Sequence, residues 1–521
     1  MHRFNASLKL LGRIIHAFTL WERVTVLLLT GVVLASTAQL TAGIIAPLTG
    51  SSGKTLYTEG LVGQPKLLNP LFADFNDVDR DIGSLIFSGL VLYDPDVSNF
   101  VPNLAENVER SKDNKTYTVT IRQNALWHDG QPVTSDDVIF TFSEVIQDPG
   151  FKNAPLRTAF KGISISKIDE RTISFTLPQV NSFFISYLTT GIIPKHILGT
   201  ASIAEIEKNP FNKKPIGSGP YRYPESAPAL FDGQTQLTLE SFENFYGEKP
   251  NISHVRFLFF PDAETMVKEQ SSLNGIAKLR GGLKTGIPEE RFKMYTYKLP
   301  QLMTVFFNME SQRVQSKHLR QALVKSVDKN TLLSKIDDAV RVDRMYFSEA
   351  PDEWIHVFDV AAANKILSDQ GWSMGDDGFR HNSRGETLSL TVLSKRFTEN
   401  TPLEEETQLL LATLRNFWQD IGIQITIRRE TGDTFSELLQ KREYDMFVTG
   451  QSLGDNFDTY AFWHSTQRGT SGGLNFSELQ SFRVDSAIED LRLTFDSKKK
   501  RQKMEFLEDL IEEETPALFL Y

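Results

Sequence analysis

The chain has 521 residues, too many for a single hydrophobic core, so the sequence predicts two or three lobes. A hydrophobic content of 40% and a charged content of 23% are typical of a soluble globular body. The formal net charge of −10 argues against a nucleic-acid partner. Because cysteine is absent, the chain has no disulfide, no thiol chemistry, no thiolate metal site and no cysteine for lipid attachment.

An uncharged apolar run occupies residues 24–46. About 20 apolar residues span the hydrocarbon core of a bilayer, so this run predicts one transmembrane helix. Basic residues in segment 1–23 favour a cytoplasmic tail, and 47–53 is a flexible linker to the body. The alternative is a cleaved signal peptide, with the small residues 36–38 as its cleavage site. Both interpretations place the body outside the cytoplasm.

The strongest local signal in the body is segment 125–146, where a turn leads into a helix. Gly130 can adopt positive φ and Pro132 cannot continue a strand ladder, so the chain turns here. Thr134 can cap the helix, and Asp137 stands three residues later, where its side chain reaches back in a capping box. The apolar residues that follow repeat at helical spacing, which predicts one buried face.

Strands and helices alternate along the rest of the body. Segments 116–122 and 171–177 alternate apolar and polar residues, as strands with one buried face do. The clearest run has strands at 388–393, 423–427 and 444–449, a helix at 403–421 and a short helix capped by Asp433. Strands alternating with helices in this way predict a parallel sheet with crossover helices.

Seven short segments match, in order, the blocks of a known family. They are 68–71, 125–146, 193–196, 215–221, 244–250, 307–328 and 482–521. In these blocks the chain resembles the family 5 solute-binding proteins of ABC transporters, a group that includes dipeptide, oligopeptide and nickel receptors. Each block alone is weak, but seven in the same order are a specific signal.

The resemblance implies an α/β fold like that of periplasmic binding proteins (type II, cluster C), with two lobes, a hinge and an extra subdomain. One transmembrane helix would precede this fold in the chain. The implied parts are a first lobe at 54–90, 215–299 and 487–521, an extra subdomain at 91–214, and a third lobe at 300–486. Such proteins close their lobes around cargo and then dock on a membrane permease with its ATPase. We therefore expect a monomeric receptor, anchored to the cell membrane by one pass, whose binding domain is extracytoplasmic. Peptides are the expected cargo, because an extended peptide can bond to strand edges.

The loop 451–463 carries the binding chemistry, because it follows a buried strand at the sheet end where α/β folds bind ligands. The predicted ligand-binding residues are Gln451, Asp455, Asp458, Tyr460 and Trp463. In peptide receptors that resemble this chain, an aspartate of this loop holds the α-ammonium of the peptide, and the residue match points to Asp455. A solvated turn acid is the alternative. Gln451 stands where such receptors often have tryptophan, which leaves the cargo open.

Catalytic chemistry finds no support in the sequence. The nine histidines are scattered without metal-ligand spacing, and no nucleophile elbow or Ser/His/Asp set can be assembled. We therefore predict no catalytic residue, no metal ligand and no cofactor. Segment 217–220 lacks the lysine of a phosphate loop and indicates a tight turn near a crossing between lobes. The sequence is also compatible with a receptor for a nickel complex or an oligosaccharide, with a sensor or peptide chaperone of the same fold, and with a membrane-tethered hydrolase.

The chain stops at 518–521 in an apolar run that predicts a strand. Proteins that resemble this one usually continue past this point. An unpaired apolar strand at a sheet edge favours aggregation. The expectation is therefore either a partial sequence or a shortened first lobe.

Overall fold

The computed structural model describes residues 55–73, 76–97, 99–279, 283, 286–297, 301–337, 339–345, 355–397, 401–452, 458–469 and 473–521. Within this part, Leu56–Tyr521 forms one compact unit. The predicted anchor at 24–46 lies outside the described residues. Among the residues that are described, no helix is long and apolar enough to cross a membrane.

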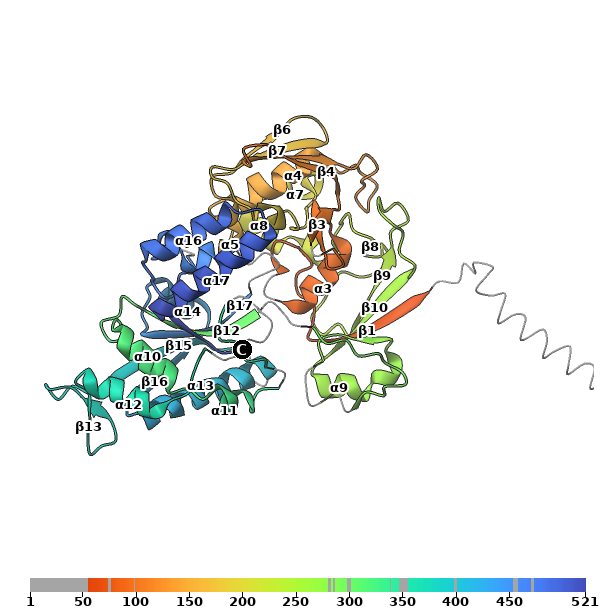
Figure 1. Ribbon diagram of the computed structural model, residues 1–521. Helices are drawn as coiled ribbons and strands as arrows, with labels where there is room; N and C mark the ends of the chain where they lie inside the picture. Colours follow the sequence, from red (N-terminus) through yellow and green to blue (C-terminus); the bar gives the residue numbers. More distant parts are fainter. Residues whose placement is uncertain are drawn as a thin grey trace, which may run out of the picture. The chain divides into compact units, whose positions relative to one another are not determined.

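The first sheet has the strand order β11-β1-β10-β9-β8 (Figure 1). Strand β1 runs parallel to both of its neighbours, β10 and β11, whereas β9 is antiparallel to β10. Helix α3 (Asp77–Ile86) buries Ile82 and Ile86 completely, and the Asn76 side chain caps it by accepting from the Val78 N–H. The remaining bounds are β1 Leu56–Val62, β8 Tyr221–Arg222, β9 Gln236–Ser241, β10 His254–Phe260, β11 Gly275–Ile276, α9 Ala263–Lys268 and the 3₁₀ turn η4 Gln270–Ser272.

A four-stranded antiparallel sheet, β4-β5-β7-β6, and the hairpin β2-β3 follow. The predicted strands at 116–122 and 171–177 are confirmed as β5 and β7, and their apolar residues are buried as the alternation requires. The bounds are β2 Val91–Asp94, β3 Asn99–Pro102, β4 Ala105–Arg110, β5 Thr116–Ile121, β6 Ser164–Lys167 and β7 Thr172–Thr176. The helices here are α4 Ser135–Ile139, η2 Phe140–Ile146, α5 Ala154–Phe160, α6 Phe184–Tyr187, α7 Lys195–Leu198, α8 Ile203–Lys208 and η3 Pro210–Lys213. One hydrophobic core joins this sheet to the first one.

The helix predicted after Thr134 is confirmed, and so is its capping box with Asp137. Its second half differs from an α-helix, since α4 continues as the π-helix η2, where the Thr141 hydroxyl donates back to the Asp137 carbonyl at 2.8 Å. The buried Asp137 carboxylate also accepts from the Trp127 indole N–H at 3.4 Å and the Lys195 backbone N–H at 2.9 Å. The segment therefore organises the core of this subdomain.

Segment 217–220 packs against α3 and encloses the ring of His128. A Cβ on Gly217 would lie 1.9 Å from the Ile86 carbonyl oxygen, so only glycine fits there. The Gly217 N–H donates to His128 Nδ1 at 3.1 Å, and His128 Nε2 lies 3.0 Å from the Gly219 carbonyl oxygen. These contacts select the neutral tautomer with the proton on Nε2. Burial lowers the pKa of His128 to about 4, and the predicted tight turn is a packing element at this point.

Stability should therefore depend on pH through His128. The folded-state pKa lies below the ordinary value of 6.5, so the unfolded chain binds the proton first. The neutral ring contributes fully above pH 6.5, and its contribution falls as the pH drops from 6.5 towards 4. Urea unfolding of the wild type and of His128→Gln should show a difference in unfolding free energy that shrinks by up to about 3 kcal/mol over this range. A difference that stays constant with pH would contradict the neutral assignment.

The third sheet has the order β16-β15-β17-β12-β18. Strand β15 is parallel to both β16 and β17, which confirms the predicted parallel unit, and β12 joins β17 antiparallel. The predicted long helix is α13, but Asp433 is not the cap of α14, because Thr431 holds that position and Asp433 lies in the first turn. The bounds are β12 Gln301–Phe307, β15 Ser389–Lys395, β16 Gln424–Glu430, β17 Met446–Ser452, β18 Ala517–Phe519 and the hairpin β13 Ser373–Met374, β14 Arg380–His381.

Helices cover both faces of this sheet (Figure 1). Alternate residues of β12 point to opposite cores, Val305 and Phe307 to one and Leu302 and Phe306 to the other. The first face packs on α10 Lys317–Lys325, α11 Lys329–Leu333, α12 Val360–Asp369 and α13 Pro402–Asp420. The second packs on α14 Gly432–Gln440, α15 Tyr460–Trp463, α16 Phe482–Arg492 and α17 Ser497–Glu514.

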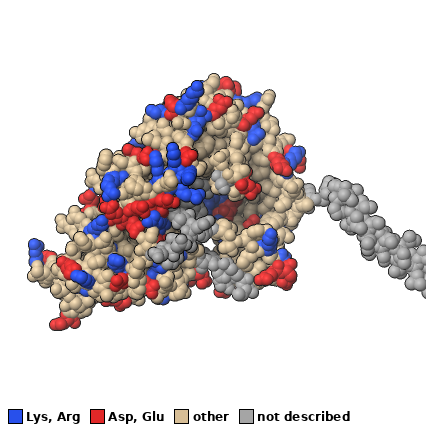
Figure 2. Space-filling model, in the orientation of Figure 1, with Lys and Arg blue, Asp and Glu red and all other residues tan. Residues whose placement is uncertain are grey.

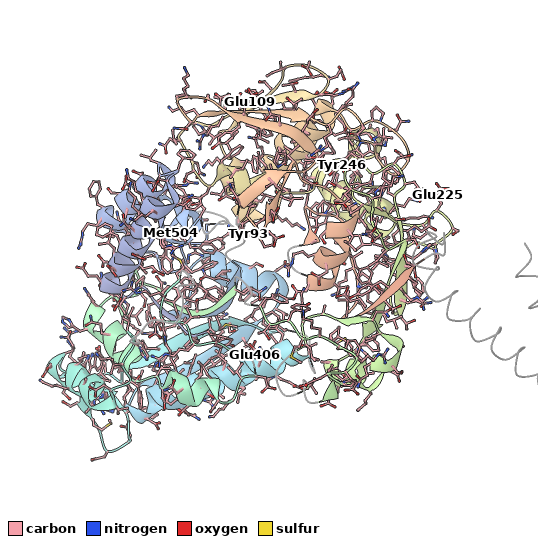
Figure 3. All side chains as sticks on the ribbon, turned by 45° about the vertical axis from the view of Figure 1, so that its right-hand side comes forward. Tyr93, Glu109, Glu225, Tyr246, Glu406 and Met504 are labelled. Carbon is pink, nitrogen blue, oxygen red and sulfur yellow. The ribbon has the colours of Figure 1, made fainter. Side chains whose placement is uncertain are left out.

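The C-terminal strand requires a correction. We expected 487–521 in the first lobe, but β18 pairs antiparallel with β12 in the third sheet, with Phe519 opposite Thr304. The strand is buried, and the Tyr521 hydroxyl donates at 2.8 Å to Glu406 of α13. Glu406 is labelled in Figure 3. The apolar C-terminal run is thus paired and covered on this sheet. The other lobe boundaries stay predictions.

Helix α17 carries basic residues in its first half and acidic residues in its second half, visible as adjoining blue and red bands in Figure 2. This order opposes the helix macrodipole, which favours anions at the N-terminus. Partners outside the helix compensate for it. Arg344 pairs with Asp509 at 2.7 Å, Arg483 pairs with Glu513 at 2.9 Å, and Lys503 pairs with Asp490 at 2.7 Å.

Candidate ligand-binding loop

The candidate site begins where β17 ends, at the carboxyl end of the parallel strands. Gln451 is 5% exposed, and its Oε1 accepts from the Thr304 hydroxyl at 3.4 Å. Its Nε2 is buried and has no hydrogen-bond partner among the described residues. A buried amide without an acceptor is costly, so Gln451 presents a donor that a bound carbonyl or carboxylate would satisfy.

The predicted ammonium ligand Asp455 lies in 453–457, outside the described residues. Its assignment therefore stays a prediction. The structure does describe residues on either side of this segment, Gln451 before it and Asp458 after it.

Asp458 has a partner set within the protein. Its side chain is 2% exposed, and Oδ2 accepts from Arg492 Nη2 at 2.9 Å and from the Tyr187 hydroxyl at 2.9 Å. The guanidinium of Arg492 in turn lies 4.2 Å from the ring centroid of Tyr460. These contacts give Asp458 a structural role. Its predicted contact with ligand stays a prediction.

Two further contacts connect α16 and α17 to the segment 181–187, which contains Tyr187. The Ser182 N–H donates to the Arg492 carbonyl at 2.7 Å, and Lys500 Nζ lies 3.6 Å from the ring centroid of Phe183. Burial lowers the pKa of Lys500 to about 8, although the charge of Asp458 acts to raise it. The antiparallel subdomain and the binding loop thus meet at one buried carboxylate.

The two remaining predicted residues are positioned differently. Tyr460 is partly buried, and its hydroxyl lies 2.9 Å from the Thr466 hydroxyl. Trp463 is fully buried, packs against Phe306 and Phe519, and donates its indole N–H to Met345 Sδ at 2.8 Å. Its contacts are those of a core residue.

Sequence reasoning did not find Tyr187, Arg492 or Lys500. Tyr187 and Asp458 are 271 residues apart, so no local pattern links them. Helices α16 and α17 carry many charged residues, and nothing in the sequence separates Arg492 or Lys500 from the others. Within the described residues, no group of three or more His, Cys, Asp or Glu side chains is placed to hold a metal ion.

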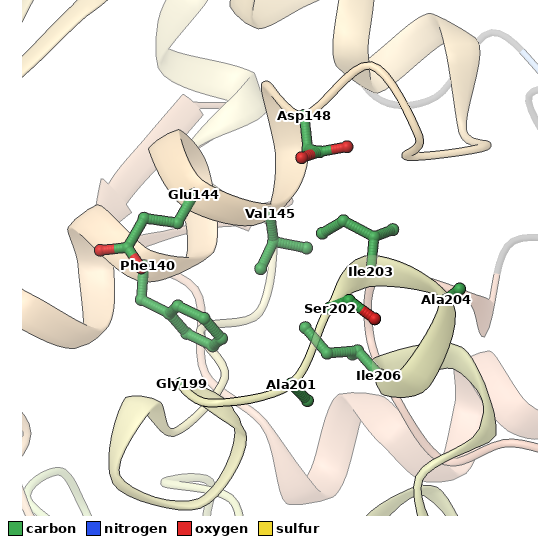
Figure 4. A pocket seen from close by; sticks show the side chains of 10 residues that line it. All are labelled: Phe140, Glu144, Val145, Asp148, Gly199, Ala201, Ser202, Ile203, Ala204 and Ile206. Carbon is green, nitrogen blue, oxygen red and sulfur yellow. The ribbon is translucent and has the colours of Figure 1, made fainter.

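A separate concavity of about 370 Å³ lies in the antiparallel subdomain, between η2 and α8 (Figure 4). Its polar side chains already have partners: Glu144 pairs with Lys195 at 2.6 Å, and the Ser202 hydroxyl donates to Glu205 at 2.7 Å. The Asp148 carboxylate accepts from the Gly150 N–H at 2.7 Å. The loop at the end of β17 is therefore the better candidate site.

The chain is similar to known proteins over most of its length. The family model for bacterial extracellular solute-binding proteins, family 5 (middle), matches residues 99–473. The oligopeptide-binding protein AppA of Bacillus subtilis is 26% identical over 487 residues, with 89% of this chain and 85% of that protein covered. The dipeptide-binding protein of Escherichia coli is 22% identical, with 88% and 87% covered.

Solved structures show the same fold. AppA of Bacillus subtilis in complex with a nonapeptide superposes with a TM-score of 0.72 at 25% identity, covering 89% of this chain and 92% of that one. NikZ of Campylobacter jejuni in complex with Ni(L-His) gives a TM-score of 0.71 at 23% identity, covering 90% and 92%. The α/β fold expected from the sequence is confirmed.

The buried ion pair between Asp458 and Arg492 leads to a stability prediction. Asp458→Asn would leave the Arg492 guanidinium without its charge partner, and removing one member of a buried pair costs about 3–5 kcal/mol. Urea unfolding should show a loss of this size. The matched control is Asp369→Asn, whose pair with Lys365 is 60% and 76% exposed and should contribute less than about 1 kcal/mol. Equal losses in the two variants would contradict the structural role of Asp458.

Proposed function

Since the chain belongs to the family 5 bacterial extracellular solute-binding proteins, we propose that it captures peptides outside the cytoplasm and delivers them to the permease of an ABC importer. The lobes close around the cargo, and the closed form docks on the permease as a monomer. Support for peptides comes from relatives named for oligopeptide and dipeptide binding. The observation that carries the proposal is the buried Gln451 amide at the carboxyl end of the sheet, for which the described part of the chain offers no acceptor.

The cargo would meet two kinds of group in this loop. Gln451 donates to a main-chain carbonyl, which every peptide has, so this contact does not depend on the peptide sequence. Asp455 holds the α-ammonium, because a carboxylate in a water-poor cleft pairs strongly with a cation. Asp458 stands three residues after Asp455 and is tied to Arg492 and Tyr187, so it fixes one end of the segment.

Calorimetry with a free tripeptide and its N-acetylated form tests the ammonium contact. Asp455→Asn should weaken binding of the free peptide by about 2–5 kcal/mol, because a buried ammonium would lose its partner. The N-acetylated peptide should bind weakly to both proteins. The control is Asp433→Asn, in the first turn of α14 and outside the loop, which should leave both affinities unchanged. Equal affinity of the wild type for both peptides would remove the ammonium contact.

We further propose that residues 24–46 anchor the body to the cell membrane by a single pass. The full chain should then stay with the membrane fraction after an alkaline carbonate wash, which releases peripheral proteins. N-terminal sequencing should find residues 1–23 still attached. A soluble species that begins at Gln39 would establish the cleaved signal peptide instead.

A further inference from the structure

A second cavity, of about 290 Å³, lies beside β18 in the third sheet. Its walls come from α10, α17, β18 and the two segments on either side of 346–354. The apolar part of the wall includes Val324, Met345, Val357, Ile511, Leu518 and Phe519. Two apolar side chains at its edge, Ile355 and Val357, are 36% and 60% exposed. Exposed apolar groups beside a cavity are typical of a binding surface.

Several charged groups of the wall are already paired. Lys329 Nζ lies 2.6 Å from Asp343 Oδ1, and both side chains are almost fully buried. Arg344 Nη2 lies 3.2 Å from Glu512, and Arg344 Nη1 lies 3.8 Å from Glu508. Arg344 Nη2 also lies 2.7 Å from Asp509, so three carboxylates share the charge of Arg344.

Three hydrogen-bond donors of the wall are not paired in this way. The Nε of Arg344 is buried without a hydrogen-bond partner. Lys325 and Gln321 of α10 are partly buried residues, and their side chains have no ion-pair or hydrogen-bond partner in the described part of the chain. The cavity thus combines an apolar wall with donors that lack an acceptor among the described residues, and the charge of Lys325 has no counter-ion among them. A ligand that satisfies them must supply acceptor oxygens and negative charge.

We propose that this cavity binds a small apolar carboxylate, with its hydrocarbon part against β18 and its carboxylate on Lys325. An ammonium placed at Lys325 would be repelled by the charge of this residue. A neutral apolar molecule would give the Lys325 ammonium no counter-ion. The site uses none of the loop residues 451–463 and is independent of the peptide proposal.

Isothermal titration of the purified full chain with octanoate and with octylamine tests this site. These probes have the same chain length and opposite charge. Octanoate should bind saturably at one site, and octylamine should not compete with it. Lys325→Met keeps much of the side-chain length but removes the charge, so it should weaken octanoate binding by about tenfold or more. Lys335→Met, at an exposed lysine that does not line the cavity, is the matched control and should bind like the wild type.

A second variant tests the apolar wall. Val324→Trp places a large ring in the cavity and should abolish octanoate binding while peptide affinity stays unchanged. Octanoate binding that survives both Lys325→Met and Val324→Trp would overturn the proposal. Absence of saturable binding to the wild type, or equal binding of octylamine, would do the same.

Discussion

A buried carboxylate is stable only if its charge is neutralised by close partners, and Asp458 meets this condition with groups from distant parts of the chain. Arg492 and Tyr187 both bond to Oδ2, so the binding loop, the end of α16 and the α6 segment must come together. Ser182 and Lys500 strengthen the same junction from either side. The position of the candidate binding loop therefore depends on an electrostatic requirement as well as on the apolar packing of the sheet.

The parallel sheet supplies the rest of the frame. Helices on both faces of β12, β15 and β17 leave only the strand ends for polar chemistry. At one such end, the Gln451 amide has no acceptor within the residues that the structure describes, and this is where the family relationship leads us to expect cargo. The side chain of Trp463, by contrast, is buried in the core against Phe306 and Phe519. A residue type suited to ligand contact can thus be used for packing a few residues away.

Local signals predicted much of the fold. The capping box of Thr134 and Asp137 and the strands at 388–393, 423–427 and 444–449 depend on residues that are near in sequence, and the structure confirms them. Contacts between distant residues could not be predicted in this way. An apolar strand such as β18 fits any sheet edge, so its pairing with β12 was missed, and nothing near Asp458 points to Tyr187. The cap of α14 was displaced by two residues because Thr431 and Asp433 are both good capping residues.

The central claim is that this chain is a peptide receptor of the family 5 solute-binding proteins. Mass spectrometry of small molecules released by denaturing protein purified from its own cells tests it most directly. The account predicts a mixture of short peptides with free N-termini, at about one peptide per chain. A single non-peptide solute in the same amount, with no peptide recovered, would contradict it.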